Sequence, residues 1–279
     1  MVSSIPKVLV GSPVSRNHSY CTDDYIKGIL SLSYNNFDVL LIDNSDDEKF
    51  YNELLKKTEN TKIKVIRAGN EIKSIKNKLA FCRNILRKKV LDESYDYLFC
   101  LDQDVVPPTD SIERFIRDNK LVNSGIYYSY FKRGDKIIQK PVLYRGLNEE
   151  EINVLEKDKE KLEYVNKYMY DYLVSVNWDF KKVMLKFSVN DVAGDKLIPI
   201  KSAGTGCVFI SNNILEKIEF HINENEEGFD DVIFFRDLEN IEVQAYADTG
   251  IKCKHSIETR PWSWGNKGNE IVITKPENI

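Results

Sequence analysis

The chain has 279 residues and a mass of 32.4 kDa, enough for one large α/β domain or two small ones whose cores are held by burial alone. Apolar residues make up 42% of the sequence and charged residues 30%, so the composition excludes disordered, collagen-like and coiled-coil proteins. The net charge is -4, from 40 Lys and Arg against 44 Asp and Glu, which disfavours a nucleic-acid partner.

Five cysteines lie far apart and form no C-x-x-C pair, so the sequence predicts neither a disulfide framework nor a zinc knuckle. The first apolar run ends at Gly11 and Pro13, which makes it too short for the core of a signal peptide or for a membrane span. Charges interrupt every later apolar stretch. We therefore expect a cytoplasmic protein with no transmembrane segment, and peripheral contact with a membrane remains open.

The first half of the chain alternates short apolar runs with amphipathic stretches. Continuous apolar runs of this length are typical of parallel strands that are buried on both faces. We expect such strands at residues 7–11, 37–42 and 95–101, and a further strand is possible at residues 62–66.

Three helices are predicted between these strands. One begins at Thr22 with acidic residues in its first turn, and a second begins at a capping box formed by Ser45 and Glu48. The third covers residues 72–90, where apolar side chains recur at steps of three and four and the opposite face is basic. Because strands alternate with helices, we expect an α/β fold with a doubly wound, mainly parallel sheet.

The regular alternation stops after about residue 120. An R-G-D turn at residues 133–135 predicts a β-hairpin, and a capping box of Asn148 and Glu151 predicts the start of a long helix. We interpret residues 119–200 as an insertion within one domain, because no Gly/Ser linker separates them from their neighbours. Regular elements then return at residues 202–210, from Asn212, at residues 228–231, at residues 241–247 and at residues 251–255.

Polar residues follow several of the predicted strands, at the edge of a parallel sheet where ligands bind. Asp43 ends one apolar run, Asp102 and Asp104 end another, and His255 follows the last. Two carboxylates separated by one residue can hold a hard divalent cation, which can bridge a diphosphate. Taken singly, each of these residues also fits a turn, a strand end or a structural histidine. The histidine at position 18 has no comparable neighbours in the sequence.

Six short segments follow one another in a specific order: the strand that ends in Asp43, the helix with Arg83-Asn84, the strand that ends in Asp102-Gln103-Asp104, and the segments SAGTGCVFI, GFDDVIFF and KCKH. In this joint order they resemble the nucleotide-sugar glycosyltransferases of the GT-A fold, close to glycosyltransferase family 2. The resemblance runs from about residue 7 to residue 255, and the middle segment has no counterpart. It implies a single GT-A-like domain, with a nucleotide-binding half at residues 1–118 and an acceptor half with a C-terminal loop at residues 201–279.

The resemblance implies a role for each matching residue. Pro13 and Asp43 would hold the nucleoside of a nucleoside-diphosphate sugar, with UDP or GDP as the nucleotide. Arg83 and Asn84 match an element near this donor, and Asp102 would face both the ribose and a metal ion.

The same resemblance implies a site for Mn²⁺ or Mg²⁺, formed by Asp102, Asp104 and His255. A cation held there would stabilise the charge that develops on the diphosphate leaving group. Gly204 and Gly206 match a small-residue segment that lies under the transferred sugar and the acceptor.

Asp231 matches the general base of the inverting enzymes, although this chain has Asp230 where those enzymes have Glu. Asp231 falls in the first turn of a predicted helix, where the helix dipole favours the ionised carboxylate and lowers its pKa. We therefore expect an ionised but weak base. The acceptor hydroxyl would belong to a glycan, a lipid or a protein.

Two other classes of function remain open. The segment LDQDVV also resembles the nucleophile motif of haloacid-dehalogenase-like phosphatases, which would use Asp102 and Asp104, with Lys201 and Asp230 or Asp231 as the later motifs. The chain could instead be a non-catalytic relative that binds a nucleotide or a carbohydrate. Trp262 and Trp264 fit either a segment that closes over the donor or simple packing.

Overall fold

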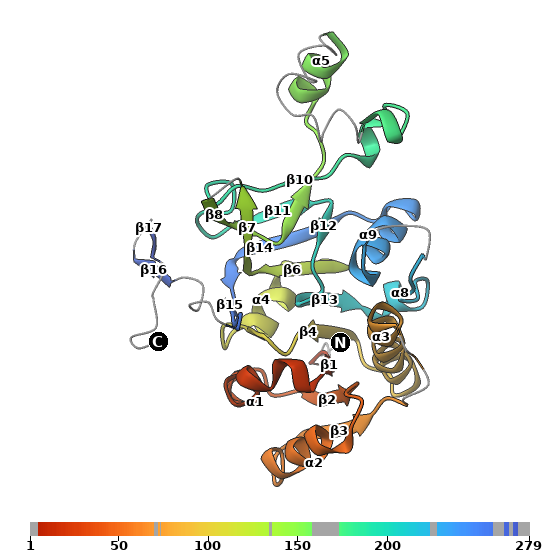
Figure 1. Ribbon diagram of the computed structural model, residues 1–279, viewed down its shortest axis with the longest axis vertical. Coiled ribbons are helices and arrows are strands. Elements are labelled where there is room, and N and C mark those ends of the chain that lie inside the picture. The colour runs from red at the N-terminus through yellow and green to blue at the C-terminus, as the bar shows by residue number, and fades with distance from the viewer. Residues whose placement is uncertain are drawn as a thin grey trace.

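Eight strands form one central sheet in the order β11-β14-β6-β13-β4-β1-β2-β3 (Figure 1). We describe a computed structural model, which covers residues 5–69, 72, 74–133, 136–157, 173–223, 228–258, 265–267 and 270–272. The strands of the central sheet are β1 (Val8–Val14), β2 (Phe37–Asp43), β3 (Ile63–Arg67), β4 (Tyr97–Leu101), β6 (Val122–Ile126), β11 (Leu197–Ile200), β13 (Cys207–Ser211) and β14 (Ala245–Lys252).

Shorter strands lie outside this sheet: β5 (Val105–Val106), β7 (Tyr128–Arg133), β8 (Lys136–Pro141), β9 (Leu143–Arg145), β10 (Leu185–Lys186), β12 (Ser202–Ala203), β15 (Lys254–His255), β16 (Gly265–Lys267) and β17 (Glu270–Val272). The helices are η1 (Arg16–Cys21), α1 (Thr22–Leu30), α2 (Glu48–Lys57), α3 (Ile75–Asp92), α4 (Ser111–Asp118), α5 (Glu149–Lys157), η2 (Phe180–Lys182), α8 (Asn212–Leu215) and α9 (Asp230–Asn240).

The central sheet is mainly parallel, as the alternation of strands and helices predicts. β1 pairs in parallel with β2 and β4, β2 with β3, and β14 with β6. β13 runs antiparallel to β4 and β6, and β11 runs antiparallel to β14. The α/β class and the mainly parallel, doubly wound sheet are thus confirmed.

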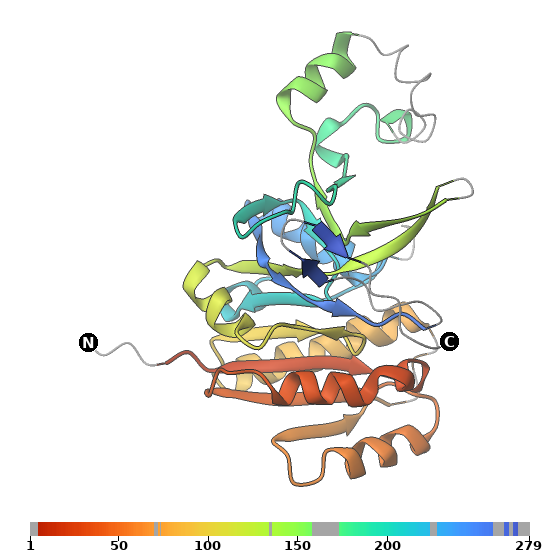
Figure 2. The same ribbon diagram turned by 90° about the vertical axis from the view of Figure 1, so that its left-hand side faces the viewer.

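Helices cover both faces of the sheet, and each face has its own apolar core. On one face, Leu9 and Leu86 belong to a core that also contains apolar side chains of α8 and α9. On the other, Val10 and Ile29 belong to a core that includes side chains of α2 and α4. In Figure 2, α1 (red) lies in front of the sheet and α3 (light orange) lies behind it. Because side chains of β1 alternate between the two cores, this strand is buried throughout, which explains its continuous apolar run.

The bounds predicted for the insertion, residues 119–200, include parts of the central sheet. Its first part supplies β6 and its last part supplies β11, and both strands belong to the central sheet. The segment between them carries the predicted β7–β8 hairpin, whose turn at residues 134–135 lies outside the described residues. α5, which stands away from the sheet, begins at the predicted capping box of Asn148 and Glu151 (Figure 1).

The capping box predicted for α2 does not form. The side chain of Asp47 caps this helix by accepting a hydrogen bond from the backbone N–H of Lys49. The Ser45 hydroxyl instead accepts a hydrogen bond from the backbone N–H of Arg16, at 2.9 Å. Ser45 therefore ties the segment after β2 to the segment after β1.

No helix within the described ranges combines the length and the apolar character needed to cross a bilayer.

Candidate active site

The strand order places a crevice between β1 and β4. From β1 the chain builds outward through β2 and β3, and it then returns to place β4 on the other side of β1. Ligands of open α/β sheets bind beyond the carboxyl ends of the strands at such a reversal. A hollow of about 420 Å³ lies there, bordered by residues 13–18 at and after the end of β1, residues 44–47 after β2, one face of α3, and Asp102–Asp104 after β4.

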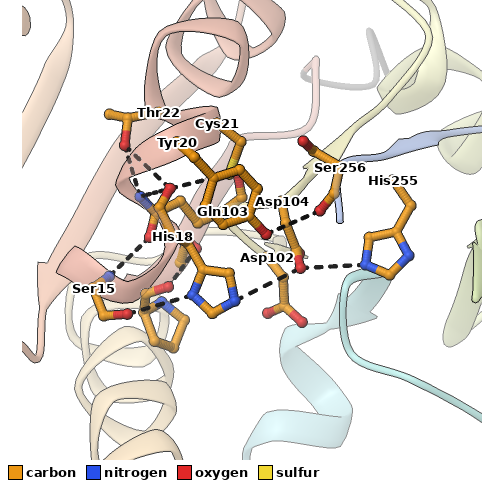
Figure 3. Close-up of polar contacts among 12 residues, drawn as sticks. Ser15, His18, Tyr20, Cys21, Thr22, Asp102, Gln103, Asp104, His255 and Ser256 are labelled. Carbon is orange, nitrogen blue, oxygen red and sulfur yellow. Dashed lines mark hydrogen bonds and ion pairs between the residues drawn. The ribbon is translucent and has the colours of Figure 1, made fainter. Parts of the chain in front are cut away.

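Asp104 borders this crevice and lies beside His255, although 151 residues separate the two in the sequence (Figure 3). The Oδ2 atom of Asp104 lies 3.2 Å from the Nε2 atom of His255. The Nδ1 atom of His255 lies 2.6 Å from the carbonyl oxygen of Tyr128. A carbonyl only accepts hydrogen bonds, so Nδ1 carries a proton, and the neutral ring would present a lone pair at Nε2.

Backbone contacts fix this pairing. β15 runs antiparallel to β5, which sets His255 opposite Val105. The backbone N–H of Ser256 donates to the carbonyl oxygen of Asp104 at 2.7 Å. The Tyr20 hydroxyl, from the segment after β1, donates to the carbonyl oxygen of Ser256 at 3.2 Å. Three segments that are distant in sequence thus hold the imidazole beside the carboxylate.

The pKa of His255 reflects these surroundings. Burial lowers the pKa of His255, but the hydrogen bond to Asp104, the charge of Asp104 and the hydrogen bond to Tyr128 outweigh burial and raise it above its usual value. A proton on Nε2 would occupy the position that a cation shared with Asp104 would take. Binding of such a cation would release this proton.

Arg83 links the segment Asp102-Gln103-Asp104, called here the acidic triplet, to the start of α9. Its Nη1 atom lies 2.6 and 2.7 Å from the two carboxylate oxygens of Asp230, and its Nη2 atom lies 3.1 Å from Oδ1 of Asp102. The side chains of Arg83 and Asp230 are 4% and 0% exposed, so each needs the other to compensate its buried charge. Arg83 borders the crevice as predicted, yet both terminal nitrogens contact carboxylates of the protein.

Asp102 is half-buried between this arginine and the crevice. Burial raises the pKa of Asp102, and the charge of Asp104 also raises it, while Arg83 acts in the opposite direction. A cation beside Asp102 and Asp104 would relieve the repulsion between the two carboxylates.

Asp231 behaves differently from the sequence-based expectation. Burial raises its pKa to about 6, against the lowering effects of Arg83 and of the Val232 backbone N–H, which donates to the carboxylate at 2.7 Å. Desolvation therefore outweighs the position in the first turn of α9. Asp231 is therefore not the weak base that the sequence predicts, because its pKa suits proton transfer near neutral pH.

Pro13 borders the crevice, but two other residues predicted to hold the donor do not. Asp43 is fully buried, and its Oδ1 atom accepts a hydrogen bond from the backbone N–H of Ser45. The side-chain amide of Asn84 exchanges two hydrogen bonds, at 2.7 and 2.9 Å, with the backbone of Phe220. Asp43 therefore shapes the loop beside the crevice, and Asn84 fastens α3 to the segment before α9.

Gly204 and Gly206 make room for a tyrosine. A Cβ atom on either glycine would clash with the phenol of Tyr127, whose hydroxyl accepts a hydrogen bond from the Gly206 N–H at 3.3 Å. The Tyr127 ring packs edge-on against the His255 ring, with centroids 5.1 Å apart. The two glycines thus leave room for the Tyr127 ring, which in turn packs against the imidazole of His255.

Sequence reasoning missed two residues of the crevice, Gln103 and His18. Gln103 is 3% exposed, and its amide accepts from the backbone N–H of Ser15 while it donates to the carbonyl of His18 and to the hydroxyl of Thr22. His18 lies beside Asp104, with 3.9 Å between Nε2 and Oδ2 (Figure 3). Nothing in the local sequence marks either residue, because the contacts join the end of β1 to the end of β4.

The donor atoms fit a cation shared with substrate. With metal–ligand distances of about 2.1 Å, neighbouring ligands at a right angle lie about 3.0 Å apart, close to the Asp104–His255 separation. In the described part of the chain, no three His, Cys, Asp or Glu side chains gather closely enough to enclose a metal ion. Mg²⁺ and chemically similar cations are held by a few protein ligands together with phosphate oxygens and water, so this sparse set suits that use.

Lys201 does not join the acidic triplet. It borders a different hollow, between β11 and α9, and its Nζ atom contacts Glu239 at 3.1 Å. Lys201 therefore does not fill the role beside Asp102 that the phosphatase motif would give it. Trp262 and Trp264 lie outside the described residues.

No family model and no curated protein matches this chain. The crystal structure of A197 from STIV is similar to it over 97% of this chain and 95% of that chain, with 16% sequence identity and a TM-score of 0.46. We base no inference on a likeness at this level.

Proposed function

We propose that this protein is a metal-dependent glycosyltransferase that moves a sugar from a nucleoside-diphosphate donor to a hydroxyl acceptor. The observation that carries the proposal is the pairing of Asp104 with His255 at 3.2 Å beside a crevice at the reversal of strand order. A diphosphate-bridging cation needs this kind of site, with few protein ligands and open space on one side.

Asp102, Asp104 and His255 would hold Mn²⁺ or Mg²⁺. When bound, the cation supplies positive charge to the diphosphate leaving group. Arg83 orients Asp102 through the contact at 3.1 Å and anchors the start of α9 through Asp230. The segments after β1 and β2 border the crevice where the nucleoside would lie.

In the reaction, the bond between the sugar carbon and the phosphate oxygen breaks, and its electron pair goes to that oxygen. The acceptor oxygen forms the new bond to the sugar carbon and loses its proton. Asp231 is the group proposed to take this proton, because a carboxylate with a pKa of about 6 is ionised at neutral pH and still basic enough to receive it.

The test is incubation with a panel of UDP- and GDP-sugars and Mn²⁺, followed by measurement of nucleotide release and of thermal stability. We expect one donor to raise the melting temperature only when metal is present, and to turn over. Asp104→Asn should lose both effects. Asp231→Asn should keep the stabilisation and lose turnover. A protein that responds to no nucleotide with metal present contradicts the proposal, and metal-dependent binding with no turnover in the wild type indicates a binding protein.

A further inference from the structure

His18 faces the crevice from the side opposite His255. Its Nε2 atom lies 3.9 Å from the Asp104 oxygen that His255 approaches to 3.2 Å, so one carboxylate oxygen lies between two imidazoles (Figure 3). The two rings differ in exposure: the His18 side chain is 44% exposed and that of His255 is 12% exposed. His255 is thus enclosed by the protein, whereas His18 is open to a ligand.

Gln103, the middle residue of the acidic triplet, holds the backbone of His18 in place. The buried amide of Gln103 donates to the His18 carbonyl at 3.1 Å and accepts from the N–H of Ser15 at 2.8 Å. The Ser15 hydroxyl lies 3.4 Å from the Nδ1 atom of His18. Gln103 thus fixes the backbone of His18, and Nε2 of the ring lies on the side of Asp104 (Figure 3).

The other cationic side chains that border the crevice are already paired. Arg16 contacts Asp47 at 2.8 Å, Lys78 contacts Asp46 at 2.6 Å, and Arg83 contacts Asp230. The distance of 3.9 Å from His18 to Asp104 exceeds the hydrogen-bond range of about 2.7–3.2 Å. Among the described residues that border the crevice, His18 is therefore the basic side chain that has no carboxylate within hydrogen-bond distance.

A diphosphate in the crevice would need such a donor. Its oxygens carry negative charge, and the crevice wall already presents Asp102 and Asp104. A cation on Asp104 would draw a phosphate oxygen to within reach of His18, since both side chains face the same space. A hydrogen bond from an imidazole N–H to a phosphate oxygen is charge-assisted and stronger than one between neutral groups.

We propose that His18 binds the diphosphate of the donor nucleotide, by donating a hydrogen bond from Nε2 to a phosphate oxygen. This inference rests on the proposed function and adds a contact that discriminates diphosphates from monophosphates and nucleosides. It also predicts that the hydrogen bond from His18 becomes stronger as the sugar–oxygen bond breaks, because the electron pair of that bond remains on the phosphate oxygen.

The experiment is calorimetric binding of a ligand ladder, namely nucleoside, nucleoside monophosphate and nucleoside diphosphate of uridine and guanosine, each with Mn²⁺. We expect His18→Ala to weaken diphosphate binding about tenfold, the effect of one hydrogen bond to a charged group, with nucleoside binding unchanged. His18→Gln keeps a donor and should recover part of the loss. His221→Gln is the matched control, because His221 is a half-exposed imidazole that contacts Asp237 and does not border the crevice.

Equal diphosphate affinity in His18→Ala and the wild type would overturn the inference. So would an equal loss at every step of the ladder, because that pattern indicates a purely structural role, and thermal melting of both His18 variants checks that they fold. A wild-type protein that binds no nucleoside diphosphate would instead remove the proposed function, and this inference with it.

Discussion

At the scale of single residues, Asp231 illustrates how burial decides a chemical property. A carboxylate in the first turn of a helix interacts favourably with the helix dipole, which lowers the pKa. In this protein desolvation has the larger effect and raises the pKa of Asp231 to about 6. The sequence reveals the position in the helix but not the depth of burial, because burial depends on segments packed from elsewhere.

This pKa predicts the pH dependence of the proposed reaction. A general base must be ionised, so the rate should fall as the pH drops through about 6, whereas a carboxylate with the ordinary value of 3.8 would stay active at pH 5. The measurement is kcat/KM against pH at saturating Mn²⁺. A rate that stays constant down to pH 5 would exclude Asp231 as the base.

The same shift predicts a change in stability. The pKa in the folded state lies above the value of the free group, so the associated stability is present below about pH 4 and is lost as the pH rises through about 6. Asp231→Asn removes this ionisation and should raise the free energy of unfolding at pH 8 by about 1–2 kcal/mol, after allowance for partial exposure. The gain should shrink toward pH 5.

Urea unfolding at several pH values measures this effect. Asp24→Asn is the control, since Asp24 also lies in the first turn of a helix but is exposed. An Asp231→Asn variant that is less stable than the wild type at pH 8 would contradict the account of burial.

Sequence reasoning found some residues of the site and missed others for one physical reason. Asp102, Asp104 and His255 follow apolar strands, and such positions are visible in the sequence. His18 and Gln103 join the site only through contacts between the ends of β1 and β4. Neither residue has a local pattern that distinguishes it from an ordinary surface or loop residue.

At the scale of elements, periodicity predicted many of the helices and strands but missed α4, β6 and β11. β6 contains Asn123 and Ser124, both fully buried, and so lacks a continuous apolar run. The Asn123 amide donates to Asp118 at 2.8 Å, and the Ser124 hydroxyl donates to the carbonyl of Cys207 at 3.1 Å. Partners from neighbouring elements therefore satisfy the Asn123 N–H group and the Ser124 hydroxyl, whereas Oδ1 of Asn123 has no partner among the described residues.

Gly204 follows β12 and packs against Tyr127, the residue between β6 and β7, and this contact predicts the effect of a small substitution. Gly204→Ala places a methyl group against the Tyr127 hydroxyl in a buried site, so we expect a loss of about 1–3 kcal/mol in the free energy of unfolding. Because Tyr127 packs against His255, affinity for Mn²⁺ should also fall. Urea unfolding and metal titration measure the two effects.

Removal of the clashing hydroxyl gives the rescue experiment. Tyr127→Phe combined with Gly204→Ala should recover part of the lost stability, because the contacts with Val142 and with the phenyl ring remain. Gly146→Ala is the control, because its nearest contact is the flexible Lys201 side chain at 3.9 Å. If Gly204→Ala behaves like Gly146→Ala, the phenol does not constrain this segment.

At the scale of the whole molecule, the alternation of buried strands and amphipathic helices was enough to predict a mainly parallel α/β sheet. The order of the strands was not predictable from periodicity, since a pattern of burial identifies a strand but not its neighbours. That order matters most for function, because the reversal at β1 and β4 creates the crevice and brings residues 13–18 to the acidic triplet.

The central claim is that Asp104 and His255 jointly hold a cation that bridges a diphosphate. Calorimetric titration of UDP and GDP, with and without Mn²⁺, into the wild type, Asp104→Asn and His255→Ala tests it most directly. We predict that metal strengthens binding of one diphosphate by the wild type at least tenfold, and that each substitution alone removes this gain. Diphosphate binding that is independent of metal, or a metal effect that survives in His255→Ala, would contradict the account.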